Sequence, residues 1–546
     1  MEDQESRSST LPRRAFLIGG TVVVGGAAAT LAACGSSGGS STSSSAAPTS
    51  GSASPSDSPS PTSSIARGGI LTYAITDSAN TESLDPMATS YTSDSLICGA
   101  LYEGVVKYND NWEIENVLAE SVEANADASE WTVTLKKGVM FHDGTELTAK
   151  DVIYTIGRNI DEEAGSPIQA RVSGSLDVKG MTAVDDHTIK FTLKRPDSAF
   201  GIGVLGARQC LVVKDGTTDF SKGNGTGPFT LVSFTPGTSW EVAKNANYWN
   251  PELPYLDGAK AVVIPDQTTK VQSVLSGQAL VGDNMPATAI PQVDASGNCV
   301  VQTRPNQTLV DIAMDSTQAP FDNEKLTLAI KFASARDLML ATAQGGQGTV
   351  TGDCPAPMDD PFYPMSTVGD RVQDIEKAKT LLAEAGYPDG IDIELFTSDV
   401  FGGMVDMATV FAESVKPAGI RVKLNKYPAD SYWDDVWLKK PMYTSYYQRR
   451  FPSEALSLNY ISTAEWNEGR FNSPELDQLV NDGLATSDEA QQKEIYGKAF
   501  TIVADQAGML IPYFINTVAP AAKSVQGIDY MPQFTVFDRA WIDPNA

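Results

Sequence analysis

Short segments in which apolar and polar residues alternate, each followed by a turn and a helical stripe, recur along this chain. In the clearest, residues 131–135 alternate Trp, Val and Leu with threonines, which is the period of a half-buried strand. Asp143-Gly144 is a turn dipeptide, because glycine accepts a positive φ without steric cost. Thr148 stands three residues before Asp151, a variant of the capping box, and an apolar helical stripe follows. The stretch is therefore predicted to form a strand, a turn and a capped helix.

A second unit predicts how two strands pair. Residues 391–397 have the pattern of a strand, residues 404–416 form a helical stripe that ends near Pro417 and Gly419, and residues 420–424 alternate again. Two strands joined by a crossover helix pair in parallel, so this unit predicts an α/β fold. The other predicted elements are strands near 70–74, 188–193, 230–234, 239–243, 310–314 and 509–515, and helices over 324–340, 375–385 and 488–505 and from Pro474.

Chain length and net charge narrow the possible architecture and the possible partners. At 546 residues the chain is too long for one core and long enough for two or three lobes. Its 68 acidic and 40 basic residues give a formal net charge of −28. This balance excludes nucleic acid as the expected partner, because binding to nucleic acid needs a basic surface. The negative net charge attracts cations over long distances, which weakly favours cationic solutes over anionic ones.

The N-terminal 34 residues are predicted to be a signal peptide. Arg13-Arg14-Ala15-Phe16-Leu17 resembles a twin-arginine export motif, and an apolar run follows it. That run ends at Leu31-Ala32-Ala33-Cys34, which resembles a bacterial lipobox, so Cys34 is the predicted site of lipidation. A short transmembrane anchor is the alternative, although several glycines interrupt the run. Residues 35–66 are mostly Ser, Gly, Pro, Ala and Thr and are predicted to be a disordered tether.

The residues that usually carry catalysis or metal binding are sparse. Only His142 and His187 are present, and His142 beside a turn is predicted to make a structural hydrogen bond. We find no nucleophile elbow, zinc-protease helix or phosphate loop, and we therefore expect no enzyme, no metal and no cofactor. Four cysteines lack the spacing of a zinc site, and both disulfides and buried free thiols stay open for them: Cys98, Cys210, Cys299 and Cys354.

Several landmarks in one order carry a family resemblance. They are the strand–turn–helix stretch 135–154, Leu101-Tyr102-Glu103-Gly104, Gly225-Thr226-Gly227-Pro228-Phe229, Asn245-Ala246-Asn247-Tyr248-Trp249 and Pro254-Tyr255-Leu256-Asp257. On these residues the chain is identified as a member of solute-binding protein family 5 of the ABC transporters, which includes peptide- and nickel-binding lipoproteins. The resemblance implies a two-lobed α/β fold of the periplasmic-binding-protein type. It also implies an extra subdomain in the first lobe and a ligand cleft between the lobes.

The resemblance also implies a domain division and a role. The first lobe is expected to combine 67–104, 225–305 and 516–546, with 105–224 as its extra subdomain and 306–515 as the second lobe. The implied role is that of a monomeric receptor on the outer face of the cell membrane. It would capture a peptide or peptide-like solute and deliver it to ABC permease subunits. A secreted peptide hydrolase and a sensor that engages a membrane signalling partner are the alternatives.

The candidate solute-binding residues centre on the segment 442–452. Peptide-binding relatives often place an aspartate near here for a ligand's α-amine, but this segment has no acid and offers Arg449 and Arg450 instead. A guanidinium suits a carboxylate or phosphate, which implies an oligopeptide held mainly by its backbone or a carboxylated or modified small molecule. Pairing of these arginines with surface acids is the alternative. The other candidates are Tyr91, Asp94, Asp399, Tyr446, Tyr447, Trp466 and Asn467.

Overall fold

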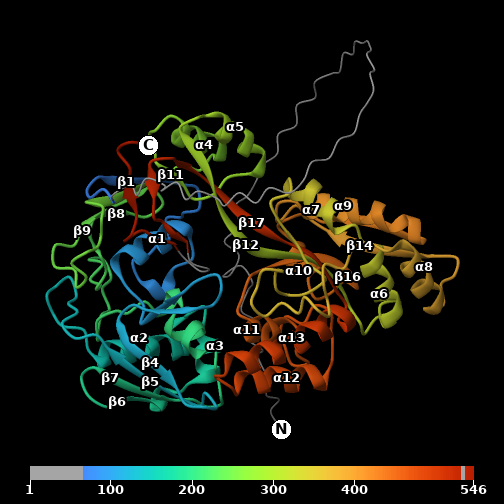
Figure 1. The fold of residues 1–546 in the computed structure, drawn as a ribbon, viewed down its shortest axis with the longest axis horizontal. Helices are drawn as coiled ribbons and strands as arrows, with labels where there is room; N and C mark the ends of the chain where they lie inside the picture. Colours follow the sequence, from blue (N-terminus) through green and yellow to red (C-terminus); the bar gives the residue numbers. More distant parts are fainter. Residues whose placement is uncertain (1–64, 531–534) are drawn as a thin grey trace, which may run out of the picture.

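One long mixed sheet runs through both halves of the protein (Figure 1). The structure is a computed structural model and describes residues 65–530 and 535–546. The predicted signal peptide and Cys34 lie outside the described residues, as does nearly all of the predicted tether. In sheet order the strands are β15 (Ile420–Lys426), β14 (Ile391–Thr397), β16 (Met442–Gln448), β12 (Cys299–Met314), β17 (Met509–Ala522), β11 (Val281–Gly282), β1 (Ile70–Ile75), β10 (Gly258–Val263), β9 (Ser239–Lys244) and β8 (Phe229–Thr235), and β13 (Gly348–Val350) pairs with β17.

The first lobe is built around β1, which pairs in parallel with β10 on one side and β11 on the other. The predicted hairpin is confirmed, since β8 and β9 pair antiparallel. Tyr73, Phe229 and Trp240 are buried in the core of this lobe. Its remaining elements are α1 (Thr92–Leu101), α4 (Gln267–Leu275), α5 (Ile290–Ala295) and the short strands β18 (Val525–Gln526), β19 (Asp529–Tyr530), β20 (Thr535–Val536) and β21 (Trp541–Ile542).

A separate four-stranded sheet with its own core forms the extra part of the first lobe. The strand, turn and capped helix predicted here are confirmed. Gly144 has a φ of 81°, and the Asp151 carboxylate accepts hydrogen bonds from the backbone N–H and hydroxyl of Thr148 at 2.7 and 2.9 Å. The elements are β4 (Ala119–Ala124), β5 (Glu130–Leu135), β7 (Thr188–Thr192) and β6 (Met181–Ala183), the hairpin β2 (Val106–Tyr108) and β3 (Ile114–Asn116), and the helices α2 (Ala149–Ile160) and α3 (Gln169–Ser175).

The second lobe contains the predicted βαβ unit. β14 and β15 pair in parallel over seven residue pairs, and the connection between them contains α9 (Met404–Val415). Ser473 caps the helix predicted from Pro474, because its hydroxyl accepts a hydrogen bond from the Leu476 N–H. The other helices are α6 (Glu324–Ala333), α7 (Arg336–Gln344), α8 (Ile375–Glu384), α10 (Tyr432–Asp435), α11 (Pro452–Asn459), α12 (Pro474–Leu484) and α13 (Glu489–Gln506).

The prediction of one helix over 324–340 is wrong. The structure ends α6 at Ala333 and starts α7 at Arg336, because Ser334 between them has extended backbone angles, φ −84° and ψ 128°. Arg336 is buried, and its guanidinium binds the Asp353 carboxylate at 2.6 Å. Asp353 lies 17 positions further along the chain, outside the helical pattern of residues 324–340, so that pattern does not predict the break.

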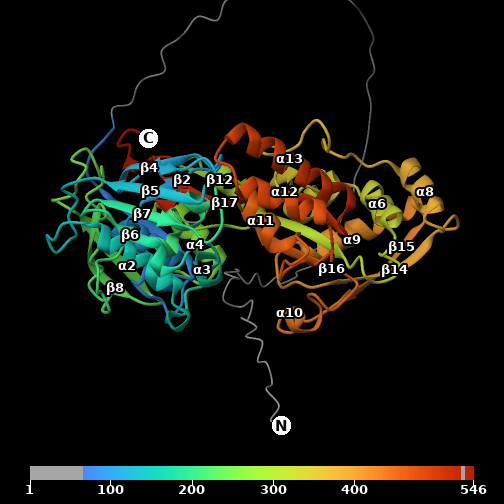
Figure 2. The same cartoon turned by 90° about the horizontal axis from the view of Figure 1, so that it is seen from below.

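Two long neighbouring strands, β12 and β17, pass from one lobe to the other (Figure 2). The prediction that residues 509–515 carry the chain back to the first lobe is confirmed, since β17 continues to Ala522 and pairs with β11. The pairing of β12 with β17 is regular up to Arg304, shifts, and resumes at Thr308. Asn306 within this shift has a φ of 54°, and its N–H donates to the side chain of Asn516 at 3.0 Å. The exact lobe boundaries stay a prediction.

Candidate functional site

The end of β16 lies beside the place where β12 and β17 cross between the lobes. β16 pairs antiparallel with β12, which sets Tyr446 opposite Val310 and Tyr447 opposite Leu309. The next partner, Thr308, is the first residue after the shift in the β12–β17 pairing. The register therefore brings the predicted aromatic candidates to the edge of the second lobe that borders the crossing.

Aromatic rings from four segments gather on the two faces of β16. Because side chains alternate along a strand, Tyr446 and Tyr447 point to opposite faces. Tyr446 stacks on Phe401 at 4.1 Å between ring centroids and meets Trp433 edge-on at 5.8 Å. Tyr447 stacks on Trp466 at 6.0 Å. The structure thus unites Tyr447 with Trp466, two residues that the sequence suggested separately.

Sequence reasoning missed several members of this group. Trp437 meets Trp466 edge-on at 6.1 Å between centroids, and its indole N–H donates to the buried carboxylate of Glu468. Trp433 and Trp437 stand four residues apart, which is a signal that could have drawn attention to this segment. Asp311 is also fully buried and lies opposite Ser445 of β16. Only the pairing of β12 with β16 reveals this position.

Both predicted arginines form ion pairs with acids of this chain, which was the alternative expected from the sequence; Asp360 is buried and Glu454 is half-buried. The Arg449 guanidinium binds the Asp360 carboxylate at 2.7 Å and donates to the backbone carbonyl of Asp110 at 2.8 Å. Arg450 binds Glu454 at 2.9 Å, and Arg171 of α3 binds the same carboxylate at 2.9 Å. Direct contact of either arginine with a solute stays a prediction.

The Arg449 pair is part of a contact between the lobes. Trp112, in the turn between β2 and β3, donates its indole N–H to Asp360 at 2.9 Å. The Arg449 guanidinium lies 5.1 Å from the centroid of the Trp112 ring, and Phe451 meets that ring edge-on at 5.6 Å. Trp112 is only 7% exposed and belongs to the core of the second lobe. The first lobe thus inserts an aromatic side chain into the second.

Four other candidates have local roles in the structure. The Asp94 carboxylate accepts hydrogen bonds from the N–H groups of Ser90 and Tyr91 and so caps α1, with Tyr91 at the N-cap position. Burial raises the pKa of Asp94 to about 6, against the lowering effect of those bonds. Asp399 is exposed and binds Lys426 at 3.0 Å. The buried Asn467 side chain exchanges hydrogen bonds with the backbone of Phe471. Their role in binding a solute stays a prediction.

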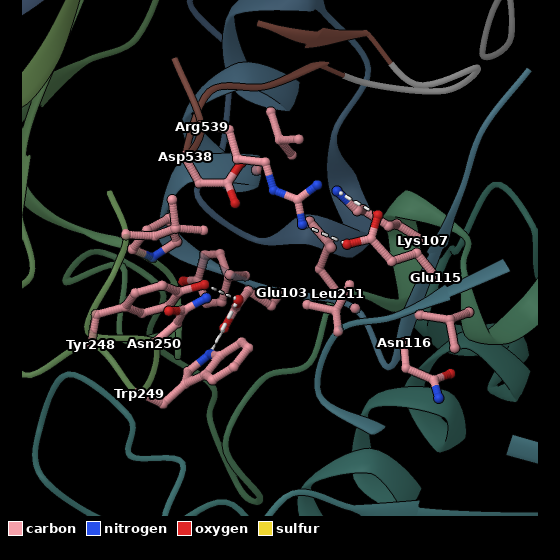
Figure 3. Close-up of a pocket in the computed structure, with 18 residues that line it drawn as sticks. Glu103, Lys107, Glu115, Asn116, Leu211, Tyr248, Trp249, Asn250, Asp538 and Arg539 are labelled. Carbon is pink, nitrogen blue, oxygen red and sulfur yellow. Dashed lines mark hydrogen bonds and ion pairs between the residues drawn. The ribbon is translucent and has the colours of Figure 1, made fainter. Parts of the chain in front are cut away.

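A pocket in the first lobe surrounds the carboxylate of Glu103 (Figure 3). Tyr248 donates its hydroxyl to Glu103 at 2.6 Å, Trp249 its indole N–H at 3.0 Å and Thr226 its hydroxyl at 2.9 Å. Burial raises the pKa of Glu103 to about 7, although each of these bonds lowers it. The pocket is lined only by first-lobe residues, so a solute there would not bridge two lobes. We infer that Glu103 has a structural role: its hydrogen bonds hold together the segments that contain Glu103, Thr226 and Tyr248-Trp249.

The surroundings of His142 and of the four cysteines favour structural roles for these residues. Nδ1 of His142 lies 3.1 Å from the Gly223 carbonyl oxygen and 3.3 Å from the Gly225 nitrogen, and Nε2 lies 3.0 Å from the Gly227 carbonyl oxygen, so backbone groups contact both ring nitrogens. Burial lowers the pKa of His142. All four cysteines of the described part are buried free thiols. Among residues 65–530 and 535–546, no group of three His, Cys, Asp or Glu side chains could hold a metal.

Two lobes connected by the paired strands β12 and β17, with an aromatic group beside this connection, define a solute-binding protein of the periplasmic type. The chain belongs to family 5 of the bacterial extracellular solute-binding proteins, because the model of that family's middle region matches residues 113–468. Members of this family are extracytoplasmic binding proteins. The resemblance inferred from the sequence is therefore confirmed.

Individual relatives agree with this assignment. The glutathione-binding protein GsiB of Pectobacterium atrosepticum is 25% identical over 471 residues, which cover 82% of this chain and 90% of that protein. HbpA2 of Haemophilus parasuis has the same fold, with a TM-score of 0.77 and 22% identity over 87% of this chain and 100% of that one. DppA of Helicobacter pylori in complex with the peptide STSA gives a TM-score of 0.69 and 23% identity over 88% and 99%. The predicted two-lobed α/β fold is confirmed by these structures.

Proposed function

We propose that this protein is a lipid-anchored receptor of an ABC importer that binds a peptide or peptide-like solute between its lobes and delivers it to a membrane permease. The observation that carries the proposal is the position of the aromatic residues at the end of β16, beside the crossing of β12 and β17. Side chains at such a crossing contact a solute from one lobe while the other lobe closes over it. Closure then distinguishes the loaded receptor from the empty one.

The relatives support a peptide-like solute. One is a glutathione-binding protein, and the structure of another was solved in complex with the peptide STSA. Aromatic side chains such as Tyr446, Tyr447 and Trp466 suit this role, because they bind extended chains through large apolar faces and retain a polar group for hydrogen bonds. We therefore propose these three as solute contacts, ahead of the two arginines.

The solute is to be found by a thermal-shift screen of the purified protein against di- to pentapeptides, glutathione and amino-acid conjugates. Calorimetry on each hit should then show saturable binding of one solute per protein, and Tyr447→Ala and Trp466→Ala should each weaken it at least tenfold. The same mixtures, analysed by chromatography after long incubation, should contain the solute unchanged. Cleavage of the peptides would instead favour a secreted hydrolase.

Membrane attachment is a separate part of the proposal. It rests on Leu31-Ala32-Ala33-Cys34 and the polar segment that follows, which lie outside the described residues. Within the described residues, no helix combines the length and apolar character needed to cross a bilayer. In cells, Cys34→Ala should release the protein from the membrane fraction and leave its solute affinity unchanged. A variant that stays in the membrane fraction would support a transmembrane anchor instead of a lipid.

A further inference from the structure

The pocket around Glu103 in the first lobe is lined by charged side chains of both signs (Figure 3). Glu103 and Asp538 both line it, and they lie close enough for the negative charge of Asp538 to raise the pKa of Glu103. Lys107 and Arg539 also line the pocket, and both bind the carboxylate of Glu115, at 3.2 and 2.6 Å. One small space is therefore bordered by carboxylates and by cationic groups.

The carboxylate of Glu103 can accept a further hydrogen bond. Three side chains donate to it, those of Thr226, Tyr248 and Trp249. Two carboxylate oxygens together offer about four acceptor positions, so these donors do not use them all. Burial disfavours the charged form of Glu103, and a positive charge beside the carboxylate favours it. An ammonium group in the pocket would supply both the donor and the charge.

The rim of the same pocket suits a carboxylate. Lys107 of β2 and Glu115 of β3 meet Arg539 of the C-terminal segment there, and the side chains of Arg539 and Glu115 are 50% and 48% exposed. A guanidinium has five N–H donors and an ammonium group has three. Arg539 and Lys107 can therefore bind a second carboxylate through charge-assisted hydrogen bonds while they keep their contacts with Glu115.

The size and position of the pocket exclude the peptide-like solute proposed for the cleft. The pocket has a volume of about 80 Å³, whereas a cavity of about 150 Å³ holds one benzene molecule. A ligand of about six non-hydrogen atoms, partly held at the open rim, is thus the largest that fits. The apolar part of the wall includes Leu211, Leu253 and Val536, which suits a short aliphatic side chain.

We infer that this pocket is a second ligand site, separate from the cleft between the lobes, and that it binds a single zwitterionic α-amino acid with a short aliphatic side chain. The ammonium group of the ligand contacts Glu103 and Asp538. Its carboxylate contacts Arg539 and Lys107, and its side chain lies against Leu211. The inference does not depend on which solute the cleft binds.

The first test compares ligands that carry one or both of the charged groups. L-Alanine, propionate and ethylamine are titrated into the wild-type protein by calorimetry at pH 8. Propionate lacks the ammonium group of alanine, and ethylamine lacks its carboxylate. We expect saturable binding of one L-alanine per protein, at least tenfold tighter than the binding of either fragment. Equal binding of the three ligands, or no saturable binding of L-alanine, would overturn the inference.

Variants then place the amino acid in this pocket. Arg539→Ala changes a half-exposed side chain at the rim and should weaken the binding of L-alanine at least tenfold. Arg421→Ala is the matched control and should change nothing, because Arg421 is 51% exposed and forms an ion pair with Asp392 in the second lobe. If Tyr447→Ala weakens L-alanine binding as much as Arg539→Ala does, the amino acid binds in the cleft and the inference is wrong.

Proton release tests the contact between the ligand's ammonium group and Glu103. The pKa of Glu103 is raised to about 7 by burial, and the charged groups that act on this carboxylate are Asp538 and Lys136. An ammonium group beside it lowers that pKa, so binding should release roughly one proton per ligand at pH 6 and almost none at pH 8. Calorimetry in two buffers of different ionisation enthalpy measures the release, and Glu103→Gln should abolish it. Absence of proton release from the wild-type protein at pH 6 would overturn this placement of the ligand.

Discussion

The indole N–H of Trp112, from the first lobe, donates a 2.9 Å hydrogen bond to the carboxylate of Asp360, in the second lobe. The same carboxylate binds Arg449 of the second lobe at 2.7 Å. Asp360 therefore accepts hydrogen bonds from one donor in each lobe. Trp112 has a φ of 66°, an uncommon conformation for a bulky residue, which the surrounding contacts must stabilise. This contact favours the arrangement of the lobes seen here.

Trp112→Phe should loosen the contact between the lobes. Phenylalanine keeps an aromatic ring but cannot donate the hydrogen bond to Asp360, which destabilises this arrangement of the lobes by about 1 kcal/mol. Small-angle X-ray scattering of the solute-free protein should show a larger radius of gyration. Trp240→Phe is the control, since the Trp240 indole N–H is buried in the first lobe without a hydrogen-bond partner in the described part of the chain. The same radius in both variants would contradict the prediction.

The second contact between the lobes should weaken in acid. Glu454 lies between Arg171 and Arg450; burial alone would raise its pKa, but the two guanidinium groups outweigh burial and lower it. A carboxylate whose folded pKa lies below its unfolded value stabilises the fold above the unfolded pKa. That stabilisation is lost as the pH falls through the folded pKa.

Glu454→Gln should reproduce this loss at neutral pH. The change leaves two partly buried guanidinium groups without their counter-charge and should cost about 2 kcal/mol, less than for a fully buried pair because the groups keep some solvent contact. Urea unfolding at pH 7 and pH 4 measures both effects. Glu489→Gln, in an exposed helical pair with Lys493, should change nothing detectable. Equal losses in the two variants would show that position between the lobes does not matter.

The capping box that opens α2 gives a third prediction. The Asp151 carboxylate accepts from Thr148 and also from the backbone N–H of Asp215 at 2.8 Å. Asp151→Ala should therefore lower the free energy of unfolding by about 1–2 kcal/mol, the upper part of the range for a helix cap. Lys150→Ala, at the neighbouring exposed position, should stay within about 0.5 kcal/mol of the wild type. Chemical denaturation compares the two, and equal effects would rule out a special role for the cap.

The sequence predicted those parts of the fold that local signals determine. The cap at Thr148 and Asp151, the β8–β9 hairpin and the β14–α9–β15 unit each depend on residues within one short segment. The break between α6 and α7 was not predicted, because the apolar spacing continues through it and the buried partner of Arg336, Asp353, lies outside the helical pattern. The lobe boundaries inferred from family landmarks remain untested by these local features.

In the candidate site, too, contacts between residues far apart in the sequence could not be predicted. Tyr447 was predicted from its place in the segment 442–452 and Trp466 from its bulky side chain before the next helix, but their stacking depends on how the chain returns after α11. Arg449 looked available in the sequence because its partner, Asp360, lies 89 positions away, and Trp112 lies 248 positions from that aspartate. Glu468 and Asp311 gave no signal of their own, since a single acid in a mixed segment is usually exposed.

The last prediction concerns Glu103 and the stability of the first lobe. Its pKa is about 7 in the folded protein because burial disfavours the charged carboxylate, and 4.5 is the ordinary value. Between these two values the folded state holds a proton that the unfolded chain has lost. Stability therefore falls as the pH rises from about 4.5 to about 7, by about 3 kcal/mol from this group alone.

Glu103→Gln removes this titration, since glutamine is neutral at every pH in the range. The difference in unfolding free energy between wild type and variant should fall as the pH rises from 5 to 7 and then level off. Taking the difference cancels the other groups that titrate here, such as Asp94. Tyr248→Phe is the companion variant. Losing the 2.6 Å hydrogen bond, which lowers the Glu103 pKa, should extend the pH dependence to higher pH. A constant difference across this range would show that Glu103 stays ionised in the folded protein, held by its three donors.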